Sequence, residues 1–112
     1  MAKAPPSAQR NRIQPFFPSL VDYTNDVIYG EIWERPGLSK RDRSLITVAA
    51  LVATHRPMQL KTHVRRALEN GVTKEEIAEI VTHMAFYAGW PAAMTAAHVA
   101  VDVYEGETDT PA

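Results

Sequence analysis

The stretch SKRDRSLITVAALVAT, residues 39–54, decides the fold class of this chain. Ser39 followed three residues later by Asp42 has the spacing of a capping box, with Asp in place of the usual Glu. From Leu45 to Ala53 every residue except Thr47 is apolar. A helix that is apolar nearly all round is either central in its fold or covered by another subunit. We therefore predict a helix over about residues 39–54 that is either central in the fold or buried by another subunit.

Similar signals on both sides of this stretch predict four further helices, over about residues 18–28, 57–70, 73–88 and 91–104. Pro57 suits a first helical turn, and Gly71 suits the residue that follows a helix end. Thr73 and Glu76 form a capping box, and the last helix is rich in alanine, which favours close helix packing. No strand-like alternation accompanies these signals. We predict an all-α, single-domain bundle of about five helices.

The length and the two chain ends suggest a simple domain organisation. A chain of 112 residues has room for one domain. Residues 1–17 contain several prolines among polar residues and are predicted to form a flexible arm. The helical domain is expected over residues 18–105, and residues 106–112 form a short acidic tail. A core this small gains stability from subunit contacts, so we expect an oligomer.

Composition excludes several classes of function. The chain has no cysteine, so disulfides, thiolate catalysis and zinc–cysteine sites are absent. The longest apolar run, residues 45–53, has nine residues including Thr47, which is too few to span a membrane. No secretory signal is visible, so a cytoplasmic location is expected. The net charge is −1, yet residues 35–66 carry eight Lys and Arg against one acid. This basic centre suits a small anionic ligand at least as well as a nucleic acid.

The candidate chemical residues are histidines and an arginine. His63 lies at the edge of the apolar stripe of its helix, and His83 lies four residues before Tyr87, so these two share one flank. The alternative for each histidine is a partly buried structural residue hydrogen-bonded to a carbonyl. Arg43 has the fork that clamps a carboxylate, and its alternative is a solvated or intersubunit charge. The histidine spacings match no metal motif, and no metal is expected.

Two stretches of the sequence together resemble one known family. The first is YGEIWERPGL, residues 29–38, followed by Arg41-Asp42-Arg43-Ser44-Leu45. The second runs from LKTH, residues 60–63, to HMAFYAGWPAA, residues 83–93. Over about residues 20–104 they are similar to the carboxymuconolactone decarboxylase family. The redox relatives in that family carry a Cys-x-x-Cys-x-x-x-His motif, which here falls on Arg56, Gln59 and His63, so dithiol peroxidase chemistry is impossible.

The resemblance implies an alkylhydroperoxidase-like (AhpD-like) helical fold that forms homo-oligomers, such as trimers or hexamers. It also implies a lyase of aromatic catabolism, in the β-ketoadipate pathway, that decarboxylates 4-carboxymuconolactone to an enol-lactone without a cofactor. The roles that this reaction needs are assigned to the following residues: His63 as proton donor, His83 or Tyr87 as donor to the lactone oxygen, Glu31 to orient a histidine, Arg43 to hold the retained carboxylate, and Trp33 and Trp90 as pocket walls.

Three other functions remain compatible with these residues. The nearest is a different lyase, isomerase or cyclase that acts on a carboxylated ring. A non-catalytic oligomeric family member would have the same helices. A helix-turn-helix protein would use the basic centre for phosphates and would bind DNA with a steep dependence on salt. We expect a small anionic dicarboxylate as the ligand, and neither nucleic acid nor membrane as a partner.

Overall fold

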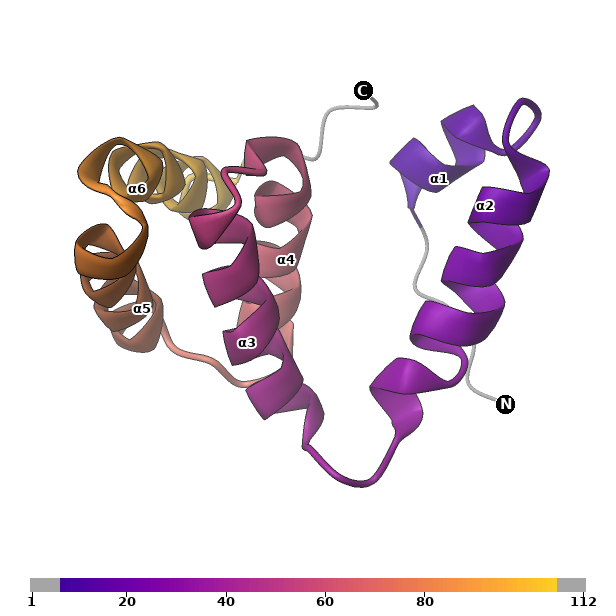
Figure 1. Cartoon of the computed structure of the whole chain (residues 1–112), viewed down its shortest axis with the longest axis horizontal. Coiled ribbons are helices and arrows are strands. Elements are labelled where there is room, and N and C mark those ends of the chain that lie inside the picture. The colour runs from indigo at the N-terminus through magenta and orange to yellow at the C-terminus, as the bar shows by residue number, and fades with distance from the viewer. Residues whose placement is uncertain (1–6, 107–112) are drawn as a thin grey trace. The chain divides into compact units, whose positions relative to one another are not determined.

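A computed structural model describes residues 7–106, and this part of the chain consists of helices and turns, with no strand. The prediction of an all-α fold is therefore confirmed (Figure 1). The described residues divide into two compact units, residues 7–39 and 40–106, and each is considered by itself. Residues 107–112, which hold most of the predicted acidic tail, lie outside the described part, as do residues 1–6. The predicted domain boundaries stay a prediction.

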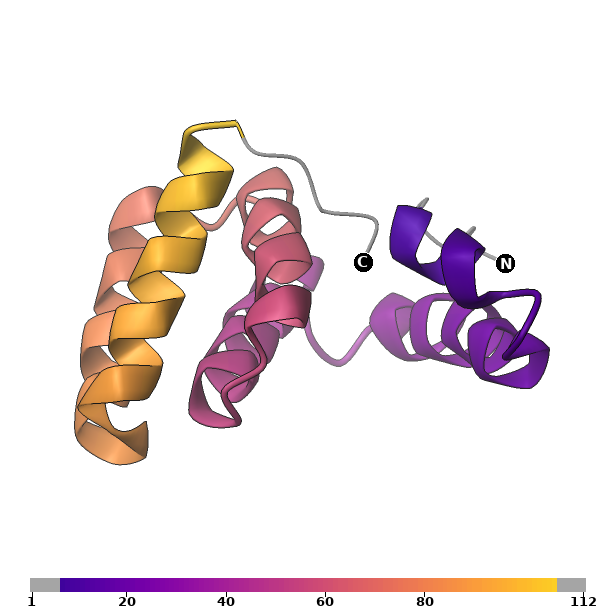
Figure 2. The same ribbon diagram turned by 90° about the horizontal axis from the view of Figure 1, so that it is seen from above.

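Four helices form the second unit: α3 (Lys40–Ala53), α4 (Pro57–Glu69), α5 (Lys74–Ala88) and α6 (Trp90–Tyr104). Helix α3 packs on α4 and α5, and α6 packs on the same two helices, so the four close a cycle in the order α3, α4, α6, α5. In Figure 2 the pair α5 and α6 lies side by side, coloured salmon to yellow. All four helices fall within two residues of their predicted bounds.

The core of this unit is a single aliphatic cluster. Helix α3 contributes Val48 and Val52, both almost fully buried, so one side of the opening stretch lies in the core. The opposite side of the same helix is exposed and carries Ile46 and Ala50. Every aromatic side chain of the protein lies outside the buried core. The remaining core residues are Leu60, Val64, Ala67, Val72, Ile77, Ala96 and Ala100.

Two polar contacts fix the register of α3 against its neighbours. The amide Nδ2 of Asn70, at the end of α4, donates to the buried hydroxyl of Ser44 over 3.0 Å, so α3 and α4 run antiparallel. The guanidinium of Arg41 donates to the Glu76 carboxylate in the first turn of α5. Because both N-terminal turns meet there, α3 and α5 run parallel. The first turn of α3 is thus tied to two helices at once.

The predicted capping box at the start of α5 is confirmed. The Glu76 N–H donates to Thr73 Oγ1 and the Thr73 N–H donates to Glu76 Oε1, each over 3.0 Å. The hydrogen bond from the Thr73 backbone, followed by that from Arg41, lowers the pKa of the Glu76 carboxyl. One carboxylate therefore caps α5 and also ties it to α3.

Gly71 ends α4 as predicted, with a positive φ of 97°. Its N–H donates to the carbonyl of Leu68, and the N–H of Val72 donates to that of Ala67, which together make a Schellman motif. The same motif ends α3, where the residue with positive φ, 55°, is His55 instead of glycine. Sequence alone placed His55 after a helix end but gave no sign of this backbone conformation.

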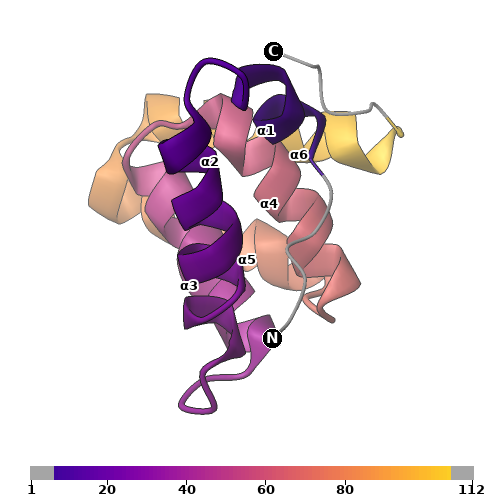
Figure 3. The same ribbon diagram turned by 90° about the vertical axis from the view of Figure 1, so that its right-hand side faces the viewer.

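The first unit contains two α-helices, α1 (Ala8–Ile13) and α2 (Pro18–Tyr23), then a π-helix, η1 (Thr24–Tyr29), and a 3₁₀ turn, η2 (Ile32–Glu34). Figure 3 shows this unit in indigo to purple. Within residues 7–106 the expected count of five α-helices is corrected to six, because α1 lies within the predicted arm. Its first turn is capped by the Ser7 hydroxyl, which accepts from the Arg10 N–H.

The predicted helix over residues 18–28 is divided between α2 and the π-helix, which extends to Tyr29. Gly30 ends this segment in a tightly packed turn, where an added Cβ would overlap the carbonyl of Asp26. Among the described residues of this unit, Val21 is the one buried hydrophobic side chain. Across residues 7–106 no helix has the length and hydropathy needed to cross a membrane.

Candidate active site

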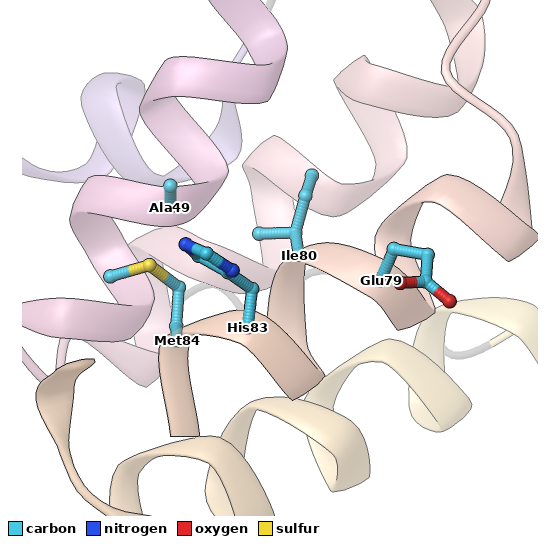
Figure 4. Close-up of a pocket in the computed structure, with 5 residues that line it drawn as sticks. All are labelled: Ala49, Glu79, Ile80, His83 and Met84. Atoms are coloured by element: carbon cyan, nitrogen blue, oxygen red, sulfur yellow. The ribbon is translucent and has the colours of Figure 1, made fainter. Parts of the chain in front are cut away.

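A pocket of about 330 Å³ lies between α3 and α5. His83 projects into it from α5, and Figure 4 shows the imidazole turned toward Ala49 of α3. Ile80 and Met84 form apolar walls on either side of the ring, while the carboxylate of Glu79 points away from it. Of the predicted site residues, all of which lie in the described part of the chain, His83 alone lines this pocket.

Tyr87 lies directly beside this pocket because it follows His83 by four residues on the same helix. The two rings stack with centroids 4.8 Å apart and planes 26° apart. Trp90, the first residue of α6, meets Phe86 edge to face at 5.7 Å. All four side chains are exposed to solvent. An exposed aromatic ring, that of Tyr87, therefore lies directly against the pocket histidine.

His63 lies on α4, which occupies the diagonal position to α5 in the helix cycle. The Ser44–Asn70 hydrogen bond sets the level of the two antiparallel helices, and His63 precedes Asn70 by seven residues. A helix rises about 1.5 Å per residue, so His63 lies roughly 10 Å further along, near the level of Leu51. His63 and His83 thus lie within about one turn of each other along α3 but belong to different helices.

Arg43 lies in the first turn of α3, one residue before Ser44. Its side chain and that of His63 are both half-buried. The Nε of Arg43 and the Nδ1 of His63 are buried atoms that make no hydrogen bond, whereas other atoms of both side chains do interact. The register separates the predicted anion clamp from the two histidines by about two helical turns.

Glu31 and Trp33 belong to the first unit, so their relation to the histidines stays a prediction. Glu31 is exposed, immediately before the 3₁₀ turn. Trp33 is half-buried, with its ring centroid 6.0 Å from that of Tyr29. The Arg10 guanidinium also lies against Tyr29, 5.0 Å from the centre of its ring. These contacts organise one side of the first unit around Tyr29.

The described residues contain no group of three or more His, Asp or Glu side chains arranged to hold a metal ion. A second, more apolar cavity of about 250 Å³ lies between α5 and α6 and ends at Tyr104. Burial raises the pKa of the Tyr104 phenol, and the charge of Glu75 raises it further. Lys74 Nζ lies 4.8 Å from the centre of this ring. Of the two cavities, only the α3–α5 pocket is lined by an imidazole.

Comparison with known proteins identifies the family. A model of the carboxymuconolactone decarboxylase family matches residues 18–102. The chain belongs to this family. Over 93 residues it is 39% identical to 4-carboxymuconolactone decarboxylase of Acinetobacter baylyi, a match that covers 83% of the chain and 69% of that relative. The resemblance of the two quoted stretches is thereby confirmed at the level of the family.

Two other relatives match shorter parts of the chain. Nitrosuccinic acid decarboxylase of Metarhizium robertsii is 41% identical over 68 residues, which cover 61% of the chain and 48% of that protein. An uncharacterised 15.0 kDa protein of Paracoccus denitrificans is 38% identical over 84 residues, 72% of the chain and 62% of the relative. The chain thus spans between about half and two thirds of the length of these relatives.

Sequence reasoning identified His83 and Tyr87 but missed the residues that shape their pocket. Ala49 was placed only in an apolar helix, and Ile80 and Met84 were given no role. The exposure of Phe86 was also missed. A signal for it was present, because residues 83, 86 and 87 follow the i, i+3, i+4 spacing of one helix side, distinct from the side of Ile77.

Proposed function

We propose that this protein decarboxylates 4-carboxymuconolactone or a closely similar carboxylated lactone, without a cofactor. The observation that carries the proposal is its 39% identity, over most of the chain, to a decarboxylase of that substrate. The nitrosuccinic acid decarboxylase supports the reaction class, because a second relative also removes carbon dioxide from an organic acid. The basic centre at residues 35–66 supplies the positive charge that an anionic substrate needs.

The reaction breaks one C–C bond and forms one C–H bond. Carbon dioxide leaves, and the electron pair of the broken bond moves through the unsaturated lactone to its carbonyl oxygen. A proton is then delivered to carbon, which gives the enol-lactone. The protein must hold the carboxylate that stays, stabilise charge on the lactone oxygen and supply that proton.

The α3–α5 pocket is the proposed place for the lactone ring. Its volume of about 330 Å³ lies at the small end of ligand pockets and suits a compact ring. Ala49, Ile80 and Met84 present an apolar lining, which strengthens electrostatic interactions with the substrate once water leaves. His83, in the pocket with Tyr87 stacked on it, is proposed to donate to the lactone oxygen.

The other roles are proposed for residues that do not themselves line this pocket. His63 is the proposed proton donor to carbon, because imidazole exchanges protons near neutral pH. Arg43 is proposed to hold the retained carboxylate through its fork. Trp90 is proposed to wall the open side. Glu31 and Trp33 of the first unit are proposed to orient a histidine and to exclude water, respectively.

The decisive experiment supplies freshly generated 4-carboxymuconolactone and follows the loss of its ultraviolet absorbance together with carbon dioxide release. His63→Gln and His83→Gln are compared with His98→Gln, a matched control at an exposed histidine of α6. Loss of a positioned general acid is expected to lower kcat by about 10²–10⁴. If wild-type protein releases no carbon dioxide, the proposed function is wrong.

The variants also distinguish the roles of the two histidines and the arginine. A normal rate in folded His63→Gln with a large loss in His83→Gln would transfer the proton-donor role to His83. Arg43→Lys keeps the charge but loses the bidentate fork, so KM is expected to rise more than kcat falls. An unchanged KM in Arg43→Lys would remove Arg43 from the substrate site.

A further inference from the structure

The cavity of about 250 Å³ between α5 and α6 has no part in the proposed reaction. The two helices lie side by side in Figure 2, and they run antiparallel because Lys74 at the start of α5 lies against Tyr104 at the end of α6. The apolar residues that line the cavity are Ile77, Ala78 and Val81 of α5 and Ala97, Ala100 and Val101 of α6. The cavity therefore extends along both helices as an apolar slot.

The two ends of this slot are polar, and one of them is charged. Lys74 and Tyr104 line one end. Thr82 follows Lys74 by eight residues on α5, so it lines the slot about 12 Å further along at a rise of about 1.5 Å per residue. Of the nine residues that line the cavity, Lys74 alone carries a charge at neutral pH. The slot is thus apolar along its length and positive at one end.

The polar groups at the charged end can accept a ligand. The Nζ of Lys74 lies 4.8 Å from the centre of the Tyr104 ring, in a cation–π contact that uses none of its N–H donors in a hydrogen bond. Within residues 7–106 Lys74 forms no ion pair, even with the adjacent Glu75. Burial and the charge of Glu75 raise the pKa of Tyr104, so its phenol is a neutral hydrogen-bond donor. An ammonium and a phenol together suit a carboxylate.

The dimensions of the slot limit the size of its occupant. Pockets for drug-sized ligands measure about 300–1,000 Å³, so this cavity suits a smaller molecule. Ala78 and Ala97 leave space beside the two helix backbones because their side chains are short. Val101 is 46% exposed, so an apolar occupant would remove part of its surface from water. A ring with a short chain fits this space, whereas a long acyl chain exceeds it.

We propose that the α5–α6 cavity binds a small monocarboxylic acid with an apolar body, such as an arylalkanoate, whose carboxylate lies against Lys74 and whose body extends along the slot toward Thr82. This site is separate from the His83 pocket, because no residue lines both cavities. The proposal does not rest on the proposed function, and its test measures binding alone.

The experiment compares three probes of similar size: 3-phenylpropanoate, its neutral amide and the cation 3-phenylpropylamine. With ¹³C-labelled alanine methyl groups, Ala78, Ala97 and Ala100 report on this cavity, and Ala49 reports on the His83 pocket. The acid is expected to shift the first three signals with a Kd of about 0.1–1 mM, an affinity attainable for about ten non-hydrogen atoms. The amide should bind severalfold more weakly than the acid, and the amine more weakly still.

Variants of opposite charge effect test the carboxylate contact. Lys74→Gln should weaken binding of 3-phenylpropanoate about two- to fivefold, which is the effect of one solvent-exposed charge pair. Glu75→Gln should strengthen it, because a neighbouring negative charge is removed. Ala97→Phe fills the slot and should weaken binding at least tenfold, and Val101→Trp repeats this test if Ala97→Phe fails to fold. Ala50→Phe, at an exposed alanine of α3 outside the lining, is the matched control.

Three results would overturn the proposal. One is the absence of any shift at Ala78, Ala97 and Ala100 with 3-phenylpropanoate at about 10 mM, a concentration that fills a site of millimolar affinity. Another is equal affinity for the acid, the amide and the amine, and the third is a shift at Ala49 alone, which would place the acid in the His83 pocket. Absence of decarboxylase activity together with the expected shifts would refute the proposed function alone.

Discussion

Exchanging glycine and non-glycine residues at two equivalent helix ends is expected to shift stability in opposite directions. Helices α3 and α4 end in the same Schellman motif, but the residue with positive φ is His55 in one and Gly71 in the other. His55→Gly should stabilise the protein, and Gly71→Ala should destabilise it. Both sites have a backbone conformation that favours glycine, so the local backbone energy decides the sign.

The magnitudes follow from the backbone energies. A non-glycine residue in the left-handed region costs roughly 1–2 kcal/mol, and histidine falls toward the lower end because it tolerates this region better than most residues. Glycine costs about 0.4–1 kcal/mol through the entropy of the unfolded chain. His55→Gly should therefore gain about 0.5 kcal/mol. Gly71→Ala should lose about 1 kcal/mol, and since no atom lies within 4 Å of the added Cβ, no steric clash contributes.

The assay is thermal and urea unfolding followed by far-ultraviolet circular dichroism, at one protomer concentration because assembly itself changes the midpoint. A change of 1 kcal/mol shifts Tm by about 4–8 °C in a domain of this size. We expect Tm to rise by about 2–4 °C in His55→Gly and to fall by about 4–8 °C in Gly71→Ala. A loss of more than about 1 kcal/mol in His55→Gly would refute the reasoning, because the imidazole would then contribute contacts that outweigh the backbone.

Three further predictions concern titration and close packing. Because the Thr73 backbone and Arg41 lower the pKa of Glu76, the charged carboxylate stabilises the fold above the unfolded pKa, and this stabilisation is lost as pH falls through the lower folded value. The difference in urea midpoint between wild type and Glu76→Gln should therefore shrink between about pH 7 and about pH 3. An equal difference at both pH values would contradict this. Burial and the charge of Glu75 raise the pKa of Tyr104, so the neutral phenol favours the folded state and the free energy of unfolding should fall as pH rises above about 10. In Tyr104→Phe this fall in stability should be smaller. An identical fall in the variant and in wild type would argue against the prediction. Gly30→Ala should lower the local stability of this segment by about 1–3 kcal/mol, because the added Cβ overlaps the Asp26 carbonyl. The loss is measured as faster amide hydrogen exchange over residues 18–34. Unchanged protection would show that the turn can relax.

Local spacing in the sequence was sufficient to predict those features whose deciding interactions lie within about four residues. The capping box of Thr73 and Glu76, the stop at Gly71 and the bounds of α3 to α6 all depend on such short-range contacts. The sixth helix, α1, was missed because it is a short segment among prolines, with one hydroxyl cap at Ser7 as its main signal. The π-helix after α2 was missed because its apolar spacing resembles that of an ordinary helix.

Part of the candidate site could be predicted from the sequence, and the rest is decided by how the helices pack. A spacing of four is sufficient to place Tyr87 beside His83, because side chains four apart share one side of a helix. That spacing gives no information on whether this side faces the core or solvent. The pocket exists because Ala49 of α3 lies opposite His83, a relation between residues 34 apart in the chain.

Sequence by itself thus determined the family, the helices and the residue types available for chemistry, since these depend on composition and on periodicity along a single helix. Tertiary structure alone decided the register, through Arg41–Glu76 and Ser44–Asn70, pairs separated by 35 and 26 residues. It also decided that the inner side of α5 packs into an aliphatic core while the aromatic side is left exposed. The physical reason is that helical spacing determines which residues share a side, whereas only the packing of neighbouring helices determines what each side meets.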